Sequence, residues 1–159
     1  MKKILTMTLA AVAFVFGLSA CSSSDDEPEV AVAEQVAGSY TGEEVMTVSG
    51  EVFNSFPTYV FTKASDTTLD MTIPASDGGS MMLPSLPVKN IVLTKSGNNI
   101  SGRLDSFTGT VINASGAEKS YTVSGMAVLF HDNMVVVSYT LKYGNMPFDF
   151  AGQFTGTKK

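Results

Sequence analysis

From Tyr40 onward, apolar and polar residues alternate along the chain in a series of short runs. The clearest runs are 69–73, 135–143 and 148–154, where every second residue is a large apolar side chain or a glycine. Alternation with a period of two is typical of β-strands that bury one face, and these runs are rich in residues that favour strands. The pattern predicts strands near 40–49, 57–63, 68–73, 88–96, 99–105, 107–113, 120–130, 134–143 and 147–156.

Turn-forming clusters of Gly, Asn, Asp and Ser separate these runs. Only one short helix is expected, between Pro28 and Gly38, because a proline begins this segment and a glycine ends it. Without a long crossover helix, neighbouring strands must be antiparallel. The fold class is therefore all-β, an up-and-down meander of eight or nine strands. Such a sheet usually closes into a barrel or folds into a sandwich, and we expect the barrel. Gly102, Gly125 and Gly152 lie inside the runs and are expected at bends or bulges that help the sheet to close.

The first twenty residues have the three zones of a secretory signal peptide: a positive start, the apolar run 4–16 and an exit rich in small residues. Leu18-Ser19-Ala20-Cys21 then matches the lipobox, in which the cysteine is acylated after cleavage. Cys21 is the only cysteine, so an internal disulfide is excluded. An ordinary signal peptide followed by a chance cysteine is the alternative. We predict that Cys21 becomes the lipidated first residue of the mature chain.

Three parts are therefore expected: a lipoprotein signal peptide over 1–20, an acidic flexible tether over 21–35 and the barrel domain over 36–159. Removing the signal takes away two of the ten Lys and Arg residues and none of the fifteen Asp and Glu residues, which leaves eight against fifteen. Such an acidic chain is a poor partner for nucleic acid or for anionic lipid headgroups. The acyl chains on Cys21 are therefore the expected contact with the membrane.

Short signals in the sequence bear on location and modification. Asp25-Asp26-Glu27, close behind the cysteine, resembles the surface-export signal of lipoproteins in some Gram-negative anaerobes. We expect lipid anchoring in the outer membrane with exposure at the cell surface, and a solvated stalk without an export role is the alternative. Asp66-Thr67-Thr68 matches the pattern of bacterial O-glycosylation, which is brief enough to occur by chance.

Residues that could carry catalysis are sparse. His131 is the only histidine and lies in an expected hairpin turn, without a placed nucleophile or orienting partner. Glu43 and Glu44 are adjacent, so they point to opposite faces of a strand and cannot form the facing carboxylate pair of a glycosidase. No spacing of His, Cys and carboxylates indicates a zinc or iron site. We expect a protein that is not an enzyme and that has no metal or cofactor.

Two short motifs point to a known family. Gly38-Ser39-Tyr40-Thr41-Gly42 opens the first strand, and Phe150-Ala151-Gly152-Gln153-Phe154-Thr155-Gly156 lies at the end of the chain. Over residues 36–157 the sequence resembles the calycin-like β-barrel domain of small Gram-negative lipoproteins. The resemblance implies a barrel, and many calycins hold a small apolar ligand. Tyr40 stands where lipocalins have the tryptophan of a Gly-x-Trp triplet, and Arg103, the only arginine, is far from the C-terminus where the lipocalin floor usually has one.

Two functions of different classes remain open. In the first, the barrel binds a small hydrophobic ligand, whose entrance is bordered by the apolar segments 51–57 and 80–87. The residues expected to contact that ligand are Phe53, Phe56, Met81, Met82 and Leu83. In the second, the barrel is filled and its surface meets an extracellular protein or a glycan. The seven methionines that follow the signal suit an adaptable ligand cavity, but residues such as Met71 and Met126 could equally fill the core.

The lipobox predicts that acylation depends on one side chain. Labelled palmitate should enter the wild-type chain and should be absent from Cys21→Ala, because the thiol is the only acylation point. Ser24→Ala, in the same segment, is the control and should keep the label. Label retained by Cys21→Ala would contradict the lipobox interpretation.

Overall fold

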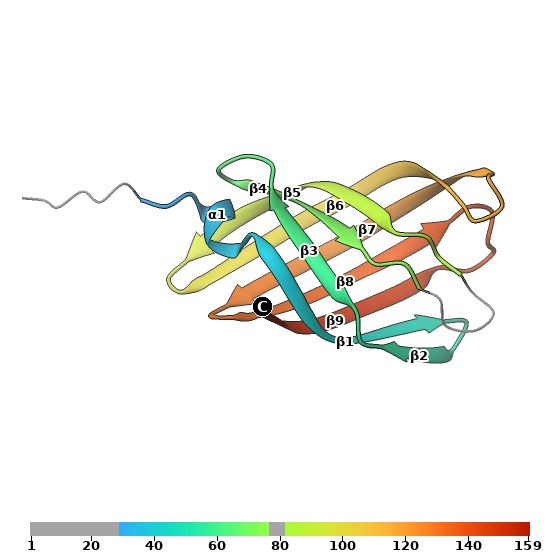
Figure 1. Ribbon diagram of the computed structural model, residues 1–159, viewed down its shortest axis with the longest axis horizontal. Coiled ribbons are helices and arrows are strands. Elements are labelled where there is room, and N and C mark those ends of the chain that lie inside the picture. Colours follow the sequence, from blue (N-terminus) through green and yellow to red (C-terminus); the bar gives the residue numbers. More distant parts are fainter. Residues whose placement is uncertain (1–28, 77–81) are drawn as a thin grey trace, which may run out of the picture.

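Nine antiparallel strands and one short helix make up the part of the chain that the computed structural model describes, residues 29–76 and 82–159 (Figure 1). The all-β class, the meander and the short helix predicted from the sequence are confirmed. The elements are α1 (Val32–Val36), β1 (Gly38–Val48), β2 (Glu51–Ser55), β3 (Thr58–Lys63), β4 (Thr68–Ile73), β5 (Leu86–Ser96), β6 (Asn99–Ile112), β7 (Glu118–His131), β8 (Met134–Tyr143) and β9 (Phe150–Lys158).

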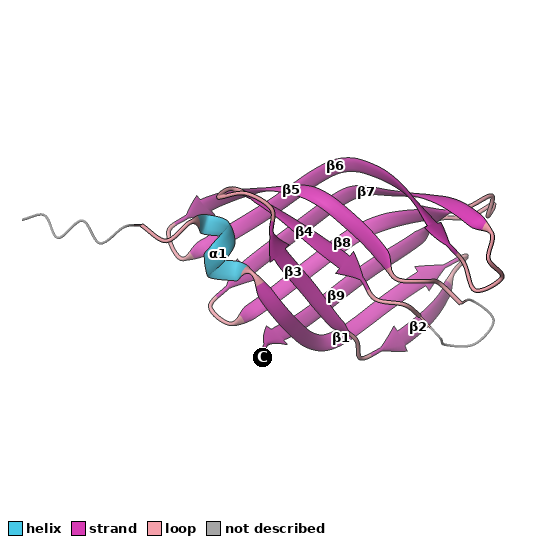
Figure 2. Cartoon of the chain, turned by 45° about the horizontal axis from the view of Figure 1, so that its top comes forward, coloured by secondary structure: helices cyan, strands magenta, loops and turns pink. Residues whose placement is uncertain are grey.

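The first strand closes the barrel by pairing with the last. β1 and β9 are antiparallel neighbours from the pair Tyr40 and Lys158 to the pair Val48 and Phe150. The other strands follow in the order β3 to β9, so that eight strands form the closed barrel and β2 is an additional strand beside β1 (Figure 2). None of the helical structure in the described ranges has the length and apolar character needed to cross a membrane.

Two predicted boundaries differ from the structure. The segment 51–57 was expected to be a loop, but its residues 51–55 form β2, which pairs with the second half of β1. β3 pairs with the first half of β1 in the same register. Every residue of β2 is exposed, so the segment shows no alternation from which a strand could be inferred. The predicted strands 99–105 and 107–113 are one strand, β6, in which two successive exposed residues, Asp105 and Ser106, shift the phase of the alternation.

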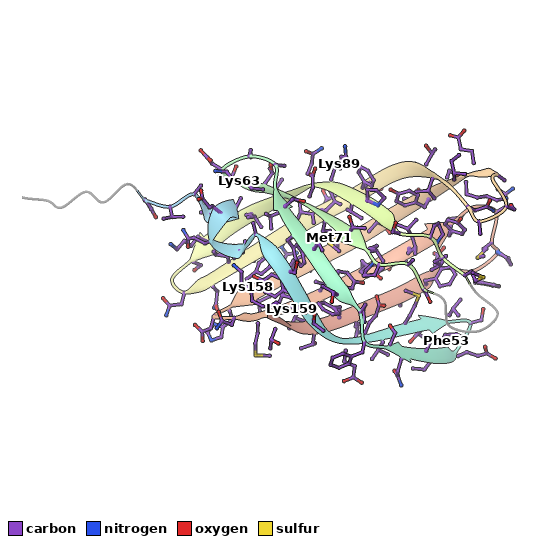
Figure 3. All side chains as sticks on the ribbon, in the orientation of Figure 1. Phe53, Lys63, Met71, Lys89, Lys158 and Lys159 are labelled. Carbon is purple, nitrogen blue, oxygen red and sulfur yellow. The ribbon has the colours of Figure 1, made fainter. Side chains whose placement is uncertain are left out.

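Side chains fill the middle of the barrel and close one end of it. Tyr59 stacks on Phe154 with ring centroids 4.2 Å apart, and Met71 is buried among the same strands (Figure 3). The closed end is covered by α1, whose Ala33 and Val36 are buried. The interior is therefore a packed core over most of its length, as small barrels usually are.

A lysine and a tyrosine hold α1 on the closed end. Tyr40 donates a hydrogen bond from its hydroxyl to the Val36 carbonyl at 3.0 Å. Lys158 donates to the Gln35 carbonyl at 3.2 Å, and its Nζ lies 5.9 Å from the centroid of the Tyr40 ring. This lysine of β9 supplies a cation at the aromatic ring of the barrel floor. The sequence has no arginine near its C-terminus, and Lys158 occupies this region instead.

Glycines inside the strands have two different roles. Gly125 has a φ of 58° and lies at the register shift between β7 and β8, which confirms the predicted bulge. The prediction was wrong for Gly152, which makes room for a side chain: a Cβ there would lie 2.3 Å from Cζ of its cross-strand neighbour Tyr139. Gly102 likewise faces Ile91, whose Cγ2 would be 2.8 Å from an added Cβ.

The tightest approach is at the closing seam, where Gly42 pairs with Gly156. A Cβ at Gly42 would lie 2.0 Å from the Thr155 carbonyl oxygen, which is backbone and cannot turn away.

Gly42→Ala should therefore lower the free energy of unfolding by at least about 3 kcal/mol, measured by urea denaturation of residues 21–159 carrying Cys21→Ser. Thr155→Ala, an exposed change on the same seam, should cost less than about 1 kcal/mol. Equal effects of the two changes would mean that the seam is not closely packed.

Candidate functional site

A cavity of about 580 Å³ lies at the end of the barrel opposite α1. β1 runs from α1 toward this cavity, and its last inward-facing residues, together with β2, form one wall. The volume is in the range of small-molecule sites. The lining consists of Glu44, Met46, Val48, Val52, Phe53, Asn54, Ser55, Phe56, Pro57, Ala75, Ser76, Leu83 and Phe150.

The alternation of β1 explains which of its side chains reach the cavity. Glu44, Met46 and Val48 are buried on the inner face, whereas Glu43 is exposed on the outer face. β2 pairs with β1 but has no described strand on its other side, so its apolar residues stay accessible. Phe53 is 37% exposed and Phe56 is 74% exposed. Figure 3 places Phe53 on β2, at the end of the barrel far from α1.

Three of the five predicted ligand residues come together at this site. Phe53, Phe56 and Leu83 all line the cavity, although they come from two segments far apart in the chain. Met82 is not in the lining and is 67% exposed. Met81 lies outside the residues that the structure describes.

The cavity wall includes a buried carboxylate that accepts three hydroxyl hydrogen bonds. Glu44 is only 5% exposed. Tyr59 and Tyr139 donate to its Oε1, the latter at 3.0 Å, and Ser55 donates to its Oε2 at 3.0 Å. The two tyrosine hydroxyls are also 3.0 Å apart. Four strands, β1, β2, β3 and β8, thus supply one polar cluster inside an apolar barrel. Hydrogen bonds of this kind compensate for removing the carboxylate from water.

From the sequence, Glu44 is considered only as a possible partner of Glu43, so the cluster is not predicted. One signal was available, because Glu44 occupies the same face of the predicted strand as Tyr40 and Met46. A carboxylate at an inward position needs partners, and this could have marked it as functional. The partners themselves could not be identified, because Tyr59 and Tyr139 come from strands whose registers with β1 the pattern does not define.

Burial keeps the tyrosines of the cluster protonated. It raises the pKa of Tyr59 well above its usual value, and the neighbouring Tyr139 and Glu44 raise that pKa further. Burial is also the largest cause of the raised pKa of Tyr139, followed by the negative charge of Glu44. A protonated phenol is a hydrogen-bond donor, so both residues remain donors to Glu44 over the physiological pH range.

His131 is not part of the cavity lining. It is the exposed last residue of β7, next to the predicted turn, with Nδ1 2.7 Å from Asn99 Oδ1. Within the described ranges, no group of three or more His, Cys, Asp and Glu residues is placed to hold a metal ion. The arrangement at Glu44 can offer an acceptor and a negative charge to a bound molecule, and the apolar wall can offer surface for burial.

Comparison with known proteins supports the fold alone. No family model matches the sequence, and no curated protein does. Among solved structures, the chain is similar to a protein of Bacteroides fragilis NCTC 9343 described as a "putative outer membrane protein". The TM-score is 0.63 at 17% identity, over 81% of this chain and 53% of that one, so this chain spans about half the length of its structural neighbour. The shared feature is the antiparallel barrel, and membership of the calycin-like family stays a prediction.

The raised tyrosine pKa values predict a loss of stability at alkaline pH. The folded state holds the phenol protons of Tyr59 and Tyr139 more tightly than the unfolded state, so their contribution is complete below about pH 10 and is lost as pH rises above it. Above about pH 10 the free energy of unfolding should fall by up to about 1.4 kcal/mol per pH unit for each of these tyrosines, measured by urea denaturation between pH 8 and 11. Tyr139→Phe should reduce this slope. Leu141→Ala, equally buried in β8, should lower stability without changing the slope, and an unchanged slope in Tyr139→Phe would contradict the assignment.

Proposed function

We propose that this chain is a lipid-anchored protein of the cell envelope whose calycin-like barrel binds a small apolar molecule without catalysis. The observation that carries the proposal is the cavity bordered by Phe53, Phe56 and Leu83, in a barrel that is otherwise filled. The envelope location is supported by the signal peptide and lipobox that end at Cys21, and by the description of the structural neighbour. Surface exposure rests on the acidic cluster behind Cys21.

The start of the described chain and the cavity lie at opposite ends of the barrel. Residues 29–31 lead into α1 at the closed end, and the cavity lies at the far end of β1 (Figure 1). An anchor at the N-terminal segment would therefore leave the cavity accessible to ligands that arrive from the aqueous side.

The affinity expected from the apolar wall alone is modest. A ligand that buries about 200 Å² of apolar surface gains roughly 5 kcal/mol at 25 cal/mol per Å². Association has its own cost in lost translational and rotational freedom, and ordering of exposed side chains such as Phe56 adds to it. The remainder corresponds to weak to micromolar binding.

The second candidate function, contact with an extracellular protein or a glycan, is supported by a different feature. Leu129 of β7 and Val136 of β8 are cross-strand neighbours that face outward and are about half exposed, and Met134 lies on the same face of β8. An exposed apolar group of this kind suits an interaction surface.

Ligand binding can be tested by removing the aromatic wall. The double change Phe53→Ser and Phe56→Ser should weaken binding of a fluorescent fatty probe about tenfold, measured by titration of residues 21–159 carrying Cys21→Ser. The thermal midpoint should change little, because both rings are exposed. The control, Leu129→Ser with Val136→Ser, removes exposed apolar side chains outside the cavity and should leave the affinity unchanged. No binding by the unaltered barrel at tens of micromolar would refute the proposal and favour the interaction surface.

A further inference from the structure

We infer that the cavity selects amphiphiles that carry a protonated amine, with the ammonium group bound at Glu44 and the apolar chain along Val48, Val52 and Phe53. This inference rests on the proposed function, because it specifies the chemistry of the ligand in the same cavity. It is carried by a buried carboxylate that lines the cavity and has only neutral partners.

The charge balance at Glu44 is incomplete. Its three hydrogen-bond donors, Ser55, Tyr59 and Tyr139, are all uncharged hydroxyls. The ion pairs among the described residues involve Lys63, Lys95 or His131, and none of them includes Glu44. Buried carboxylates are usually paired with a cation, because hydroxyl groups compensate only part of the lost hydration. A cationic ligand group would supply the missing countercharge.

The carboxylate also has room for another donor. A carboxylate offers about four lone-pair positions, and two donors on Oε1 and one on Oε2 leave a position on Oε2. Glu44 lines the cavity, so a bound molecule can approach it from that side. An ammonium group has three N–H donors and can share them between Oε2 and the oxygen of Ser55.

The distribution of polarity along the cavity fits an amphiphile with its head inward. Glu44 lies on β1 two residues before Met46 and four before Val48, so the wall becomes apolar from the carboxylate toward the end of the strand. Phe53, the cross-strand neighbour of Met46, extends this apolar surface onto β2. The mature chain, with eight Lys and Arg against fifteen Asp and Glu, also attracts cations and repels fatty acids.

Three ligands with the same ten-carbon chain separate the contributions of head and chain: decylamine, decanol and decanoate. Each is titrated at pH 7, below its micelle concentration, into residues 21–159 carrying Cys21→Ser. Decylamine should bind about tenfold more tightly than decanol, because a charged hydrogen bond contributes more than a neutral one, and decanoate should bind most weakly.

Glu44→Gln keeps the shape and the hydrogen-bond acceptor of the side chain but removes its charge. It should reduce decylamine affinity about tenfold and leave decanol affinity nearly unchanged. Glu43→Gln is the matched control, because it removes the same charge from the outer face of the same strand, and it should keep the preference for decylamine. Ser55→Lys, on exposed β2 directly opposite Glu44, places a competing cation beside the carboxylate, and it should weaken decylamine selectively even if Glu44→Gln does not fold.

The outcomes distinguish this inference from the proposed function. Equal binding of all three ligands, or an amine preference that survives both Glu44→Gln and Ser55→Lys, would show that Glu44 is only structural, while the apolar cavity would still bind. If neither the three ligands nor the fluorescent probe bind, both the ammonium site and the proposed ligand-binding function are contradicted. An amine preference that both variants abolish and Glu43→Gln retains would establish the ammonium site.

Discussion

The pairing of β1 with three other strands is the constraint on which the barrel depends. β9 pairs with β1 along one edge, and β3 and β2 share the other edge in a single register that is interrupted at Phe56 and Pro57. A slip by one residue would turn every inward side chain of β1 outward. The barrel floor at Tyr40, the polar cluster at Glu44 and the cavity wall at Val48 lie on that one face. The position of the candidate site is therefore a direct consequence of how the barrel closes.

A carboxylate inside an apolar barrel has an energetic cost that packing alone does not repay. Three hydroxyls from three other strands offset much of that cost, so the cluster also ties β1 to β2, β3 and β8. An apolar side chain at position 44 would fill the same space without needing hydrogen-bond partners. The arrangement therefore makes more sense as a site that meets a ligand than as a device for stability alone.

The sequence pattern was sufficient to predict the class, the meander and most strands, because half-buried strands carry a strong alternation. It failed at β2, where both faces are exposed and no alternation exists. The apolar residues of two segments were enough to anticipate that Phe53, Phe56 and Leu83 lie at one site, but not that Met82 would be exposed and absent from its lining. The roles of Gly152 and Glu44 depend on side chains of other strands, above all Tyr139. They could not be predicted, because a single sequence does not define which residues of two strands lie opposite each other.

The dependence of β1 on β9 also determines when the molecule can fold. The partner of Tyr40 is Lys158 on β9, with all the other strands between them in the sequence, so the seam cannot form until β9 is available. Contacts between residues so distant in sequence form late and slowly, because the intervening chain must first be ordered. A chain that passes through a translocation channel from its N-terminus would therefore stay open during transit. Closure would then begin only after the last strand had emerged on the far side.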